Sequence, residues 1–265
     1  MTTGSLDTRT FPRTAAPHWL SSLAAGLADL GALVLAVECA GCGAPDVALC
    51  RRCRSVLDAP PRRVDIGGWP TGPPAYAGPS YAGPARRAVV AWKDRGRHDL
   101  TRRLAVPLAD AVLAVPQVRT SGSRPVLLVP VPSSRPALRR RGDHLVRRLA
   151  LDAAGRVRAR GGRVRVVAAL RLVRPVADQT ALGRAGRAAN LRGAMAPRPG
   201  AAAALAGRAC IVVDDVLTTG ATVREAARVI AAAGGVVIGV ATCAATPLVG
   251  RDTTGRRVSG RPVLH

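Results

Sequence analysis

The chain has 265 residues, which is enough for one substantial hydrophobic core and a small appended module. Its 40 basic residues outnumber the 16 acidic ones, and the resulting net charge of +24 attracts polyanions most strongly at low salt. Only six aromatic residues are present (3 Trp, 2 Tyr and 1 Phe), too few and too scattered to form a stacking platform for single-stranded nucleic acid.

The first 38 residues contain a polar segment and then an apolar one. Residues 1–18 include proline, and we expect them to be disordered or loosely attached. Residues 19–37 carry leucines at helical spacing, which is compatible with a signal peptide, a membrane span or a docked amphipathic helix. Asp29 and the short length argue against a span, and Glu38 before the following cysteine does not suit lipoprotein cleavage. A docked helix is therefore favoured.

Two C-x₂-C pairs, separated by seven residues, come next: Cys39, Cys42, Cys50 and Cys53. Each pair suits a tight turn, so four thiolates can converge on one tetrahedral Zn²⁺. Two disulfides or four free thiols are the alternatives, and disulfides are rare in a reducing compartment. Because four cysteines leave no open coordination position, we predict a structural zinc.

Two amphipathic helices are predicted after a segment rich in proline and glycine. Residues 54–80 are expected to be a linker or covering loop. Pro84 suits the first turn of a helix that continues to about Trp92, and a second helix is expected over 100–115. Residues 93–97 between them read K-D-R-G-R and form either a solvated turn or an anion site. Lys93 is the only lysine beside 39 arginines, an imbalance that indicates the codon bias of a GC-rich genome.

A buried strand is predicted over residues 126–131, and it leads into a small-residue turn. The turn is formed by Pro132, Ser133, Ser134 and Arg135. A helix follows with arginines at 139–141, 147 and 148, and a strand, turn and helix in this order suit a phosphate group. Guanidinium groups bind such oxygens bidentately, although a helix with a solvated arginine face is the simpler alternative.

Residues 164–170 form a third apolar run, and residues 236–242 are predicted to form the last strand. Between them, residues 171–200 lose periodicity and contain glycine and arginine, so we expect a functional loop able to close as a lid. The tail from residue 250 is expected to be flexible.

The most informative stretch is residues 210–222. Its apolar start is typical of a strand buried on both faces, and it ends in Asp214 and Asp215. The following turn, before a helix, consists of Val216, Leu217, Thr218, Thr219, Gly220, Ala221 and Thr222. A helix N-terminus with hydroxyl donors suits a phosphate monoester, whereas two carboxylates suit sugar hydroxyls or Mg²⁺. The P-loop motif is absent, and a receiver domain would need a lysine on a later strand.

This stretch resembles the phosphoribosyl-pyrophosphate (PRPP) binding motif of type I phosphoribosyltransferases: an apolar strand, paired acids and T-T-G-x-T. The resemblance implies that Asp214 and Asp215 hold the ribose hydroxyls of Mg-PRPP at the catalytic site. It implies that the turn 216–222 binds the 5′-phosphate and that residues 132–135 form the pyrophosphate loop.

Further motifs narrow the resemblance to the ComF family of competence-associated, phosphoribosyltransferase-like proteins. They are the four-cysteine knuckle, Y-x-G-P-x-R-R with W-K-x-R-G-R, V-P-V-P before R-R-R-G, and Q-T-x-L-x-R-x-x-R-x-x-N-x-R-G. The chain departs from the usual R-G-F-N-Q by having Asp143 and His144 after Gly142, which puts pyrophosphate affinity in question. We interpret His144 as a partly exposed helical residue rather than an acid or base.

The expected fold is α/β, of the type I phosphoribosyltransferase kind, with a parallel sheet flanked by helices and a small N-terminal zinc-binding module. The expected organisation is a flexible N-terminus and docked helix (1–38), the zinc module (39–54), a linker with packing helices (55–123), the transferase core (124–250) and a tail (251–265).

Two functions are carried forward from the sequence. The first is transfer of the phosphoribosyl group from Mg-PRPP to an unidentified acceptor of the nucleobase kind, in the cytoplasm and without a membrane span. The second is a non-catalytic PRPP-binding accessory protein of DNA uptake, which docks non-specific DNA or a DNA-uptake helicase.

Overall fold

The structure is a computed structural model that describes residues 37–67, 69–120, 122, 124–133, 144–174 and 191–246. The chain divides into two units, residues 1–37 and 38–265, and the elements below all belong to the second. Predictions for the docked helix, for residues 178–190 and for the tail from 250 lie outside the described residues.

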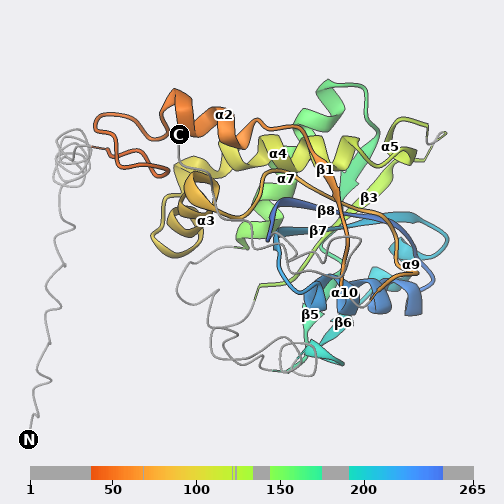
Figure 1. Ribbon diagram of the computed structural model, residues 1–265. Coiled ribbons are helices and arrows are strands. Elements are labelled where there is room, and N and C mark those ends of the chain that lie inside the picture. The colour runs from red at the N-terminus through yellow and green to blue at the C-terminus, as the bar shows by residue number, and fades with distance from the viewer. Residues whose placement is uncertain are drawn as a thin grey trace, which may run out of the picture. The chain divides into compact units, whose positions relative to one another are not determined.

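The main sheet has six strands in the order β1-β2-β8-β7-β3-β4 (Figure 1). All neighbours from β2 to β4 are parallel, and β1 is antiparallel to β2 at one edge. The strands are β1 (Arg62–Val64), β2 (Ala75–Ala77), β3 (Val126–Pro130), β4 (Val164–Val166), β7 (Ala209–Leu217) and β8 (Val236–Ala245). The prediction of a mostly parallel sheet flanked by helices is confirmed.

Helices cover both faces of this sheet (Figure 1). On one face, α4 (Thr101–Leu113) packs against α7 (Leu145–Ala159) and β8, and α10 (Ala221–Ala232) covers the other face. Shorter helices are α2 (Arg51–Leu57), α3 (Gly83–Asp94), the 3₁₀ turn η1 (His98–Leu100), α5 (Gln117–Thr120) and α9 (Ala201–Leu205). None of the helices in the described ranges is long and apolar enough to cross a membrane.

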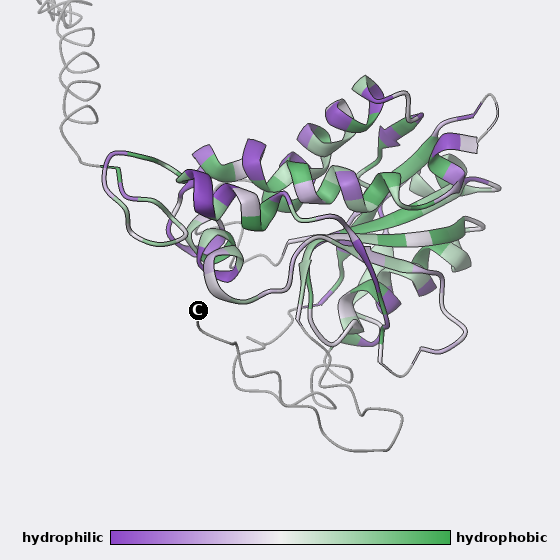
Figure 2. Cartoon of the chain, turned by 45° about the horizontal axis from the view of Figure 1, so that its top comes forward, coloured by the Kyte–Doolittle hydropathy of each residue, from purple (hydrophilic) through white to green (hydrophobic). Residues whose placement is uncertain are grey.

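The central strands are apolar because helices lie on both sides of them. Every residue of β3 is buried, and so are residues 210–213 of β7. Figure 2 shows the same pattern: hydrophobic residues fill the strands, and hydrophilic ones lie on the outer faces of the helices. This burial on two faces explains why these strands read as continuous apolar runs rather than as alternating ones.

Three segments differ from the sequence-based expectation. Residues 54–80, expected to be a linker or loop, contain β1 and β2, and β2 is a member of the main sheet. The apolar run 164–170 divides between β4 and β5 (Leu170–Leu172). β5 pairs with β6 (Met195–Pro197) in a separate two-stranded sheet, so strands lie at both ends of the segment that was expected to be an irregular loop.

β2 escaped prediction because it has only three residues and follows two prolines, which leaves no periodicity to detect. Its place is fixed by its partner β8. Val240 donates its N–H to the carbonyl of Pro74 (3.0 Å), and Gly78 donates to that of Thr242 (3.2 Å). A side chain at Gly78 would collide with the Cys243 carbonyl and would lie 2.6 Å from Cβ of Pro107 on α4.

Gly78→Ala is therefore expected to lower the free energy of unfolding by about 1–3 kcal/mol, because β2 must shift away from β8 and α4 to admit the methyl group. Urea denaturation measures the change. Gly155→Ala on α7, where no atom lies within 4 Å of the new Cβ, is the matched control and should be neutral or stabilising. An unchanged midpoint for Gly78→Ala would contradict the close packing of β2.

Candidate functional site

The paired acids lie near the carboxyl end of β7, in the middle of the sheet. Asp214 and Asp215 are 8% and 3% exposed. The Asp215 N–H donates to Oδ1 of Asp214 (2.8 Å), and the Val216 N–H donates to Oδ1 of Asp215 (2.9 Å). Backbone hydrogen bonds thus hold one oxygen of each carboxylate and orient both side chains.

Lys93 reaches this acidic pair from α3, in a part of the chain that sequence analysis did not include in the site. Its Nζ lies 2.5 Å from Oδ2 of Asp215, and its side chain is 40% exposed. Lys93 is thus an ion-pair partner of the predicted site, a role that neither a solvated turn nor an anion site had given it. The available signal was that a chain rich in arginine keeps a single lysine here.

The two carboxyl groups have pKa values displaced in opposite directions. Burial, together with the neighbouring charge of Asp215, raises the pKa of Asp214 well above its usual range. Burial acts on Asp215 as well, but the Lys93 ammonium outweighs it, so the pKa of Asp215 lies below its usual range. Asp215 is therefore the member of the pair that stays ionised.

Of the predicted phosphate turn, residues 216–222, only 218–220 form a turn: Val216 and Leu217 continue β7, and Ala221 and Thr222 begin α10. Gly220 is the N-cap residue of α10 and has φ of 75°, a left-handed conformation that favours glycine. The Ala221 N–H donates to Oγ1 of Thr219 (3.4 Å). The turn thus presents hydroxyl groups at the positive end of a 12-residue helix, as expected for a site that binds phosphate.

A segment after β1 lies over this turn. A side chain at Gly220 would collide with Cγ2 of Ile66, and Arg224 of α10 donates to the Gly67 carbonyl (2.8 Å). Arg62 donates to the carbonyl of Ala245 at the end of β8 (3.2 Å). These contacts enclose a cavity of about 260 Å³, lined by residues 62–65 together with Leu217, Thr218, Ala245 and Thr246.

The turn predicted to bind pyrophosphate begins beside the acidic strand. Val131, just after β3, donates to the Val213 carbonyl of β7 (2.9 Å), and Pro132 and Ser133 follow, both half-buried. Ser134, Arg135 and the arginines 139–141 lie outside the described residues, whereas Arg147 and Arg148 are exposed on α7. His144 is half-buried and precedes the first residue of α7.

Tyr81 adds an aromatic side chain that sequence analysis did not assign to the site. Its N–H donates to the carbonyl of Ala245 (2.8 Å), so the chain after β2 lies beside the end of β8. Burial raises the pKa of the half-buried Tyr81, and the negative charge of Asp215 contributes in the same direction. The sequence places Tyr81 only within a motif, because its position beside the end of β8 depends on tertiary structure.

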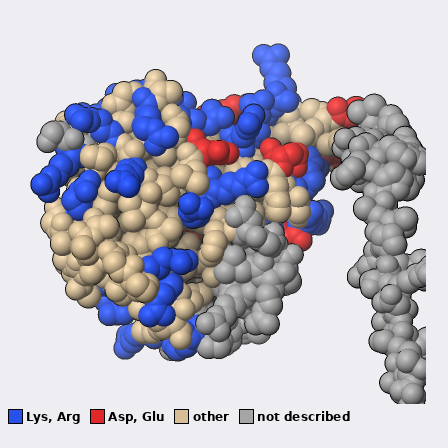
Figure 3. Space-filling model, turned by 180° about the vertical axis from the view of Figure 1, so that it is seen from behind, with Lys and Arg blue, Asp and Glu red and all other residues tan. Residues whose placement is uncertain are grey.

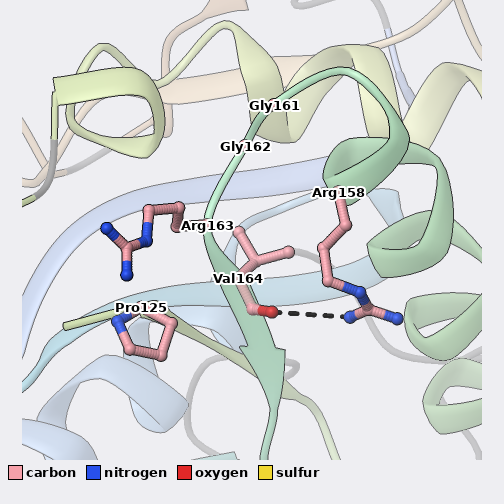
Figure 4. Close-up of a pocket in the computed structure, with 6 residues that line it drawn as sticks. All are labelled: Pro125, Arg158, Gly161, Gly162, Arg163 and Val164. Atoms are coloured by element: carbon pink, nitrogen blue, oxygen red, sulfur yellow. Dashed lines mark hydrogen bonds between the residues drawn. The ribbon is translucent and has the colours of Figure 1, made fainter. Parts of the chain in front are cut away.

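A second cavity, of about 370 Å³, lies at the opposite edge of the sheet, where β3 and β4 begin (Figure 4). It is lined by Pro125, Arg158, Gly161, Gly162, Arg163 and Val164. The side chain of Arg158 donates to the Val164 carbonyl (3.4 Å), as Figure 4 shows. Strand rise places this cavity about 20 Å from the paired acids, so it is separate from the predicted site.

The four predicted metal ligands converge. The sulfur atoms of Cys39, Cys42, Cys50 and Cys53 all lie within 4.8 Å of one another, and no disulfide joins them. The Cys42 and Cys50 sulfurs are 3.7 Å apart, close to the ~3.8 Å that two thiolates take at one tetrahedral zinc. Burial raises the pKa of Cys39, but N–H groups of Cys50, Gly41 and Cys42 outweigh it and lower the value to about 6. The donor set fits zinc.

Comparison with known proteins agrees with this geometry. A family model described as a phosphoribosyl transferase domain matches residues 159–252, a range that contains β7, both acids, the phosphate turn and α10. No curated protein matches the chain. The match supports a PRPP-using transferase in general terms, built on a mostly parallel sheet and accompanied by a four-cysteine cluster.

Lys93→Met is expected to raise the pKa of Asp215, because burial then acts without the compensating ammonium. A raised folded-state pKa disfavours the ionised form, so the variant should lose stability as the pH rises above the unfolded pKa of about 4. We expect a loss of about 1–3 kcal/mol relative to the wild type at pH 7, below the range for a fully buried pair because the lysine is 40% exposed.

Urea denaturation at pH 5 and pH 7.5 tests this expectation, and the difference between variant and wild type should grow with pH. Arg95→Met removes the same charge from an exposed position two residues away and should show little pH-dependent difference. Equal losses for Lys93→Met at both pH values would contradict the assigned ion pair.

Proposed function

We propose that this protein binds Mg-PRPP at the carboxyl ends of β7 and β3 and transfers its phosphoribosyl group to an acceptor of the nucleobase class. The observation that carries the proposal is the direct succession of two buried acids, a hydroxyl-bearing turn and the N-terminus of α10. The acids can then bind the ribose hydroxyls, while the helix N-terminus binds the 5′-phosphate of the same ligand.

In this proposal the side chains have distinct roles. Asp214 and Asp215 accept hydrogen bonds from the ribose hydroxyls. Residues 216–222 hold the 5′-phosphate, and Arg62 and Arg63 adjoin Thr218 in the cavity and offset phosphate charge. The carboxylate oxygens also fit Mg²⁺, which when bound with PRPP would neutralise charge on the pyrophosphate.

The reaction breaks the bond between the anomeric carbon and the pyrophosphate oxygen and forms a bond from that carbon to an acceptor nitrogen, which loses its proton. No protein nucleophile is required. The transition state has oxocarbenium character, so the ionised Asp215 beside the ribose would favour the developing positive charge. The remaining rate acceleration would come from positioning the two reactants.

We also propose membership of the ComF family, with a cysteine module at 39–54 and a transferase core at 124–250. The main sheet includes β1 and β2, so this core takes its edge strands from the segment 55–123. Zinc at the four cysteines and a cytoplasmic location belong to the same proposal.

A second function is favoured by one observation, the charge. Figure 3 shows lysine and arginine side chains in many separate places over one face of the molecule, with few acids among them. Such a surface suits a non-catalytic PRPP-binding accessory protein that docks DNA or a DNA-handling partner. Because the basic side chains are dispersed, this binding would ignore sequence and weaken steeply with salt.

Calorimetric titration of the zinc-loaded protein with PRPP and Mg²⁺ tests the first proposal. We expect saturable binding that weakens at least ~10-fold in Asp214→Asn/Asp215→Asn, because the ionised Asp215 loses a charged hydrogen bond, which is worth more than a neutral one. Asp58→Asn, at an exposed position after α2, is the control and should bind like the wild type.

The two functions differ in turnover. Release of pyrophosphate with any nucleobase of a panel would support the transferase, whereas PRPP binding without release would support the accessory function. The absence of PRPP binding at millimolar ligand would overturn both.

A further inference from the structure

We infer that the cysteine-bearing loop of residues 38–50 positions Lys93 on Asp215, and that Arg87 and Arg97 are the positioning residues that transmit this support through α3. The inference rests on the proposed function, since it assigns Asp215 to the PRPP site. The inference assigns the cysteine module an indirect structural role at that site, because none of the module's described residues contacts the paired acids.

The first contact lies near the start of α3. Nε of Arg87 donates to the carbonyl of Gly41, between the ligands Cys39 and Cys42, at 2.5 Å. A Cβ on Gly41 would lie 2.6 Å from Sγ of Cys53 and 3.3 Å from Cβ of Pro84. The ligand loop is therefore packed directly on the first turn of α3, with no room for a side chain at residue 41.

The second contact lies just beyond the end of α3. The guanidinium of Arg97 donates to the carbonyls of Glu38 (3.0 Å) and Ala48 (3.5 Å), close to the ligands at 39 and 50. Asp99 accepts two hydrogen bonds from the same guanidinium, both 2.9 Å, and fixes its plane. One side chain thus joins both sides of the ligand loop.

Lys93 lies between these two contacts, six residues after Arg87 and four before Arg97. The helical rise places Lys93 about 9 Å along the axis from Arg87. The preceding residue, Trp92, is fully buried, and its indole N–H donates to Oγ1 of Thr101 (3.0 Å). Both ends and the inner face of α3 are therefore held, and this fixes the direction in which Lys93 leaves the helix.

The chemistry of the loop makes this support depend on metal. Residues 38–50 contain no helix or strand, and two of the four thiols, Cys39 and Cys53, are buried. Bound zinc would cross-link the two cysteine pairs and hold the loop in one conformation. A loop of this length is too short to form an apolar core that could do the same. Loss of the metal is expected to release the carbonyls that hold Arg87 and Arg97, and with them the Lys93–Asp215 ion pair.

The single lysine allows a direct test. Acylation of Lys93 by an amine-reactive ester, followed in its own peptide by mass spectrometry, reports the ion pair. Only the neutral amine attacks the ester, and a neighbouring carboxylate favours the charged ammonium. We expect the double variant Arg87→Ala/Arg97→Ala and the zinc-stripped wild type to react about fivefold faster or more than zinc-loaded wild type. Asp215→Asn sets the rate for a lysine that lacks the Asp215 ion pair.

Arg86→Ala/Arg95→Ala is the matched control: it removes two exposed arginines from the same helix and its end and should leave the rate unchanged. Zinc content and tryptophan fluorescence of each variant confirm that the fold is retained, and Arg97→Ala alone serves if the double variant is unfolded. An acylation rate in Arg87→Ala/Arg97→Ala and in stripped protein equal to that of the wild type would overturn the inference.

Calorimetry with PRPP and Mg²⁺ separates this inference from the proposed function. Weaker PRPP binding in Arg87→Ala/Arg97→Ala than in its control would support the inference at the ligand site. Wild-type binding that fails would end the proposed function, yet faster acylation of the stripped protein would still support the positioning of Lys93. Normal PRPP binding with unchanged acylation would leave the proposed function standing and end the inference.

Discussion

Two adjacent carboxyl groups in the interior of a sheet impose the main constraint on this molecule. Burial disfavours the ionised form of both groups, and the charge of Asp215 further raises the pKa of Asp214, so ionisation of the pair needs a nearby positive charge. Lys93 supplies that charge to Asp215, so α3 must be held where its last turn reaches the end of β7. The placement of α3, and of the cysteine loop against it, follows from this requirement.

The parallel strands bring the rest of the site together at one edge of the sheet. The carboxyl ends of β2, β8, β7 and β3 lie side by side, so each following turn adds side chains at the same edge. Tyr81 follows β2, Thr246 follows β8, the acids lie near the end of β7 and Ser133 follows β3. The amino-terminal edge, where the larger cavity lies, has none of these acids or hydroxyls among its lining residues.

Local patterns were enough to predict β3, β7 and β8, a turn between β7 and α10, and the convergence of the cysteines, because each depends on neighbours in sequence. Tertiary interactions account for what was missed. β2 has three residues and takes its register from β8, while Lys93 meets Asp215, and Tyr81 reaches the end of β8, only after distant elements pack. The roles of the acids and of the phosphate turn stay predictions, since they depend on a ligand.

The two edges of the main sheet have a consequence for self-association. β1 and β4 are each three residues long, and arginine occurs in both: Arg62 and Arg63 on one edge, and Arg165 on the other. A short, positively charged edge resists pairing with an identical strand, since like charges would face each other across the new ladder. Arg165, which has no role at the proposed PRPP site, can thus still protect a sheet rich in valine and alanine from strand addition and aggregation.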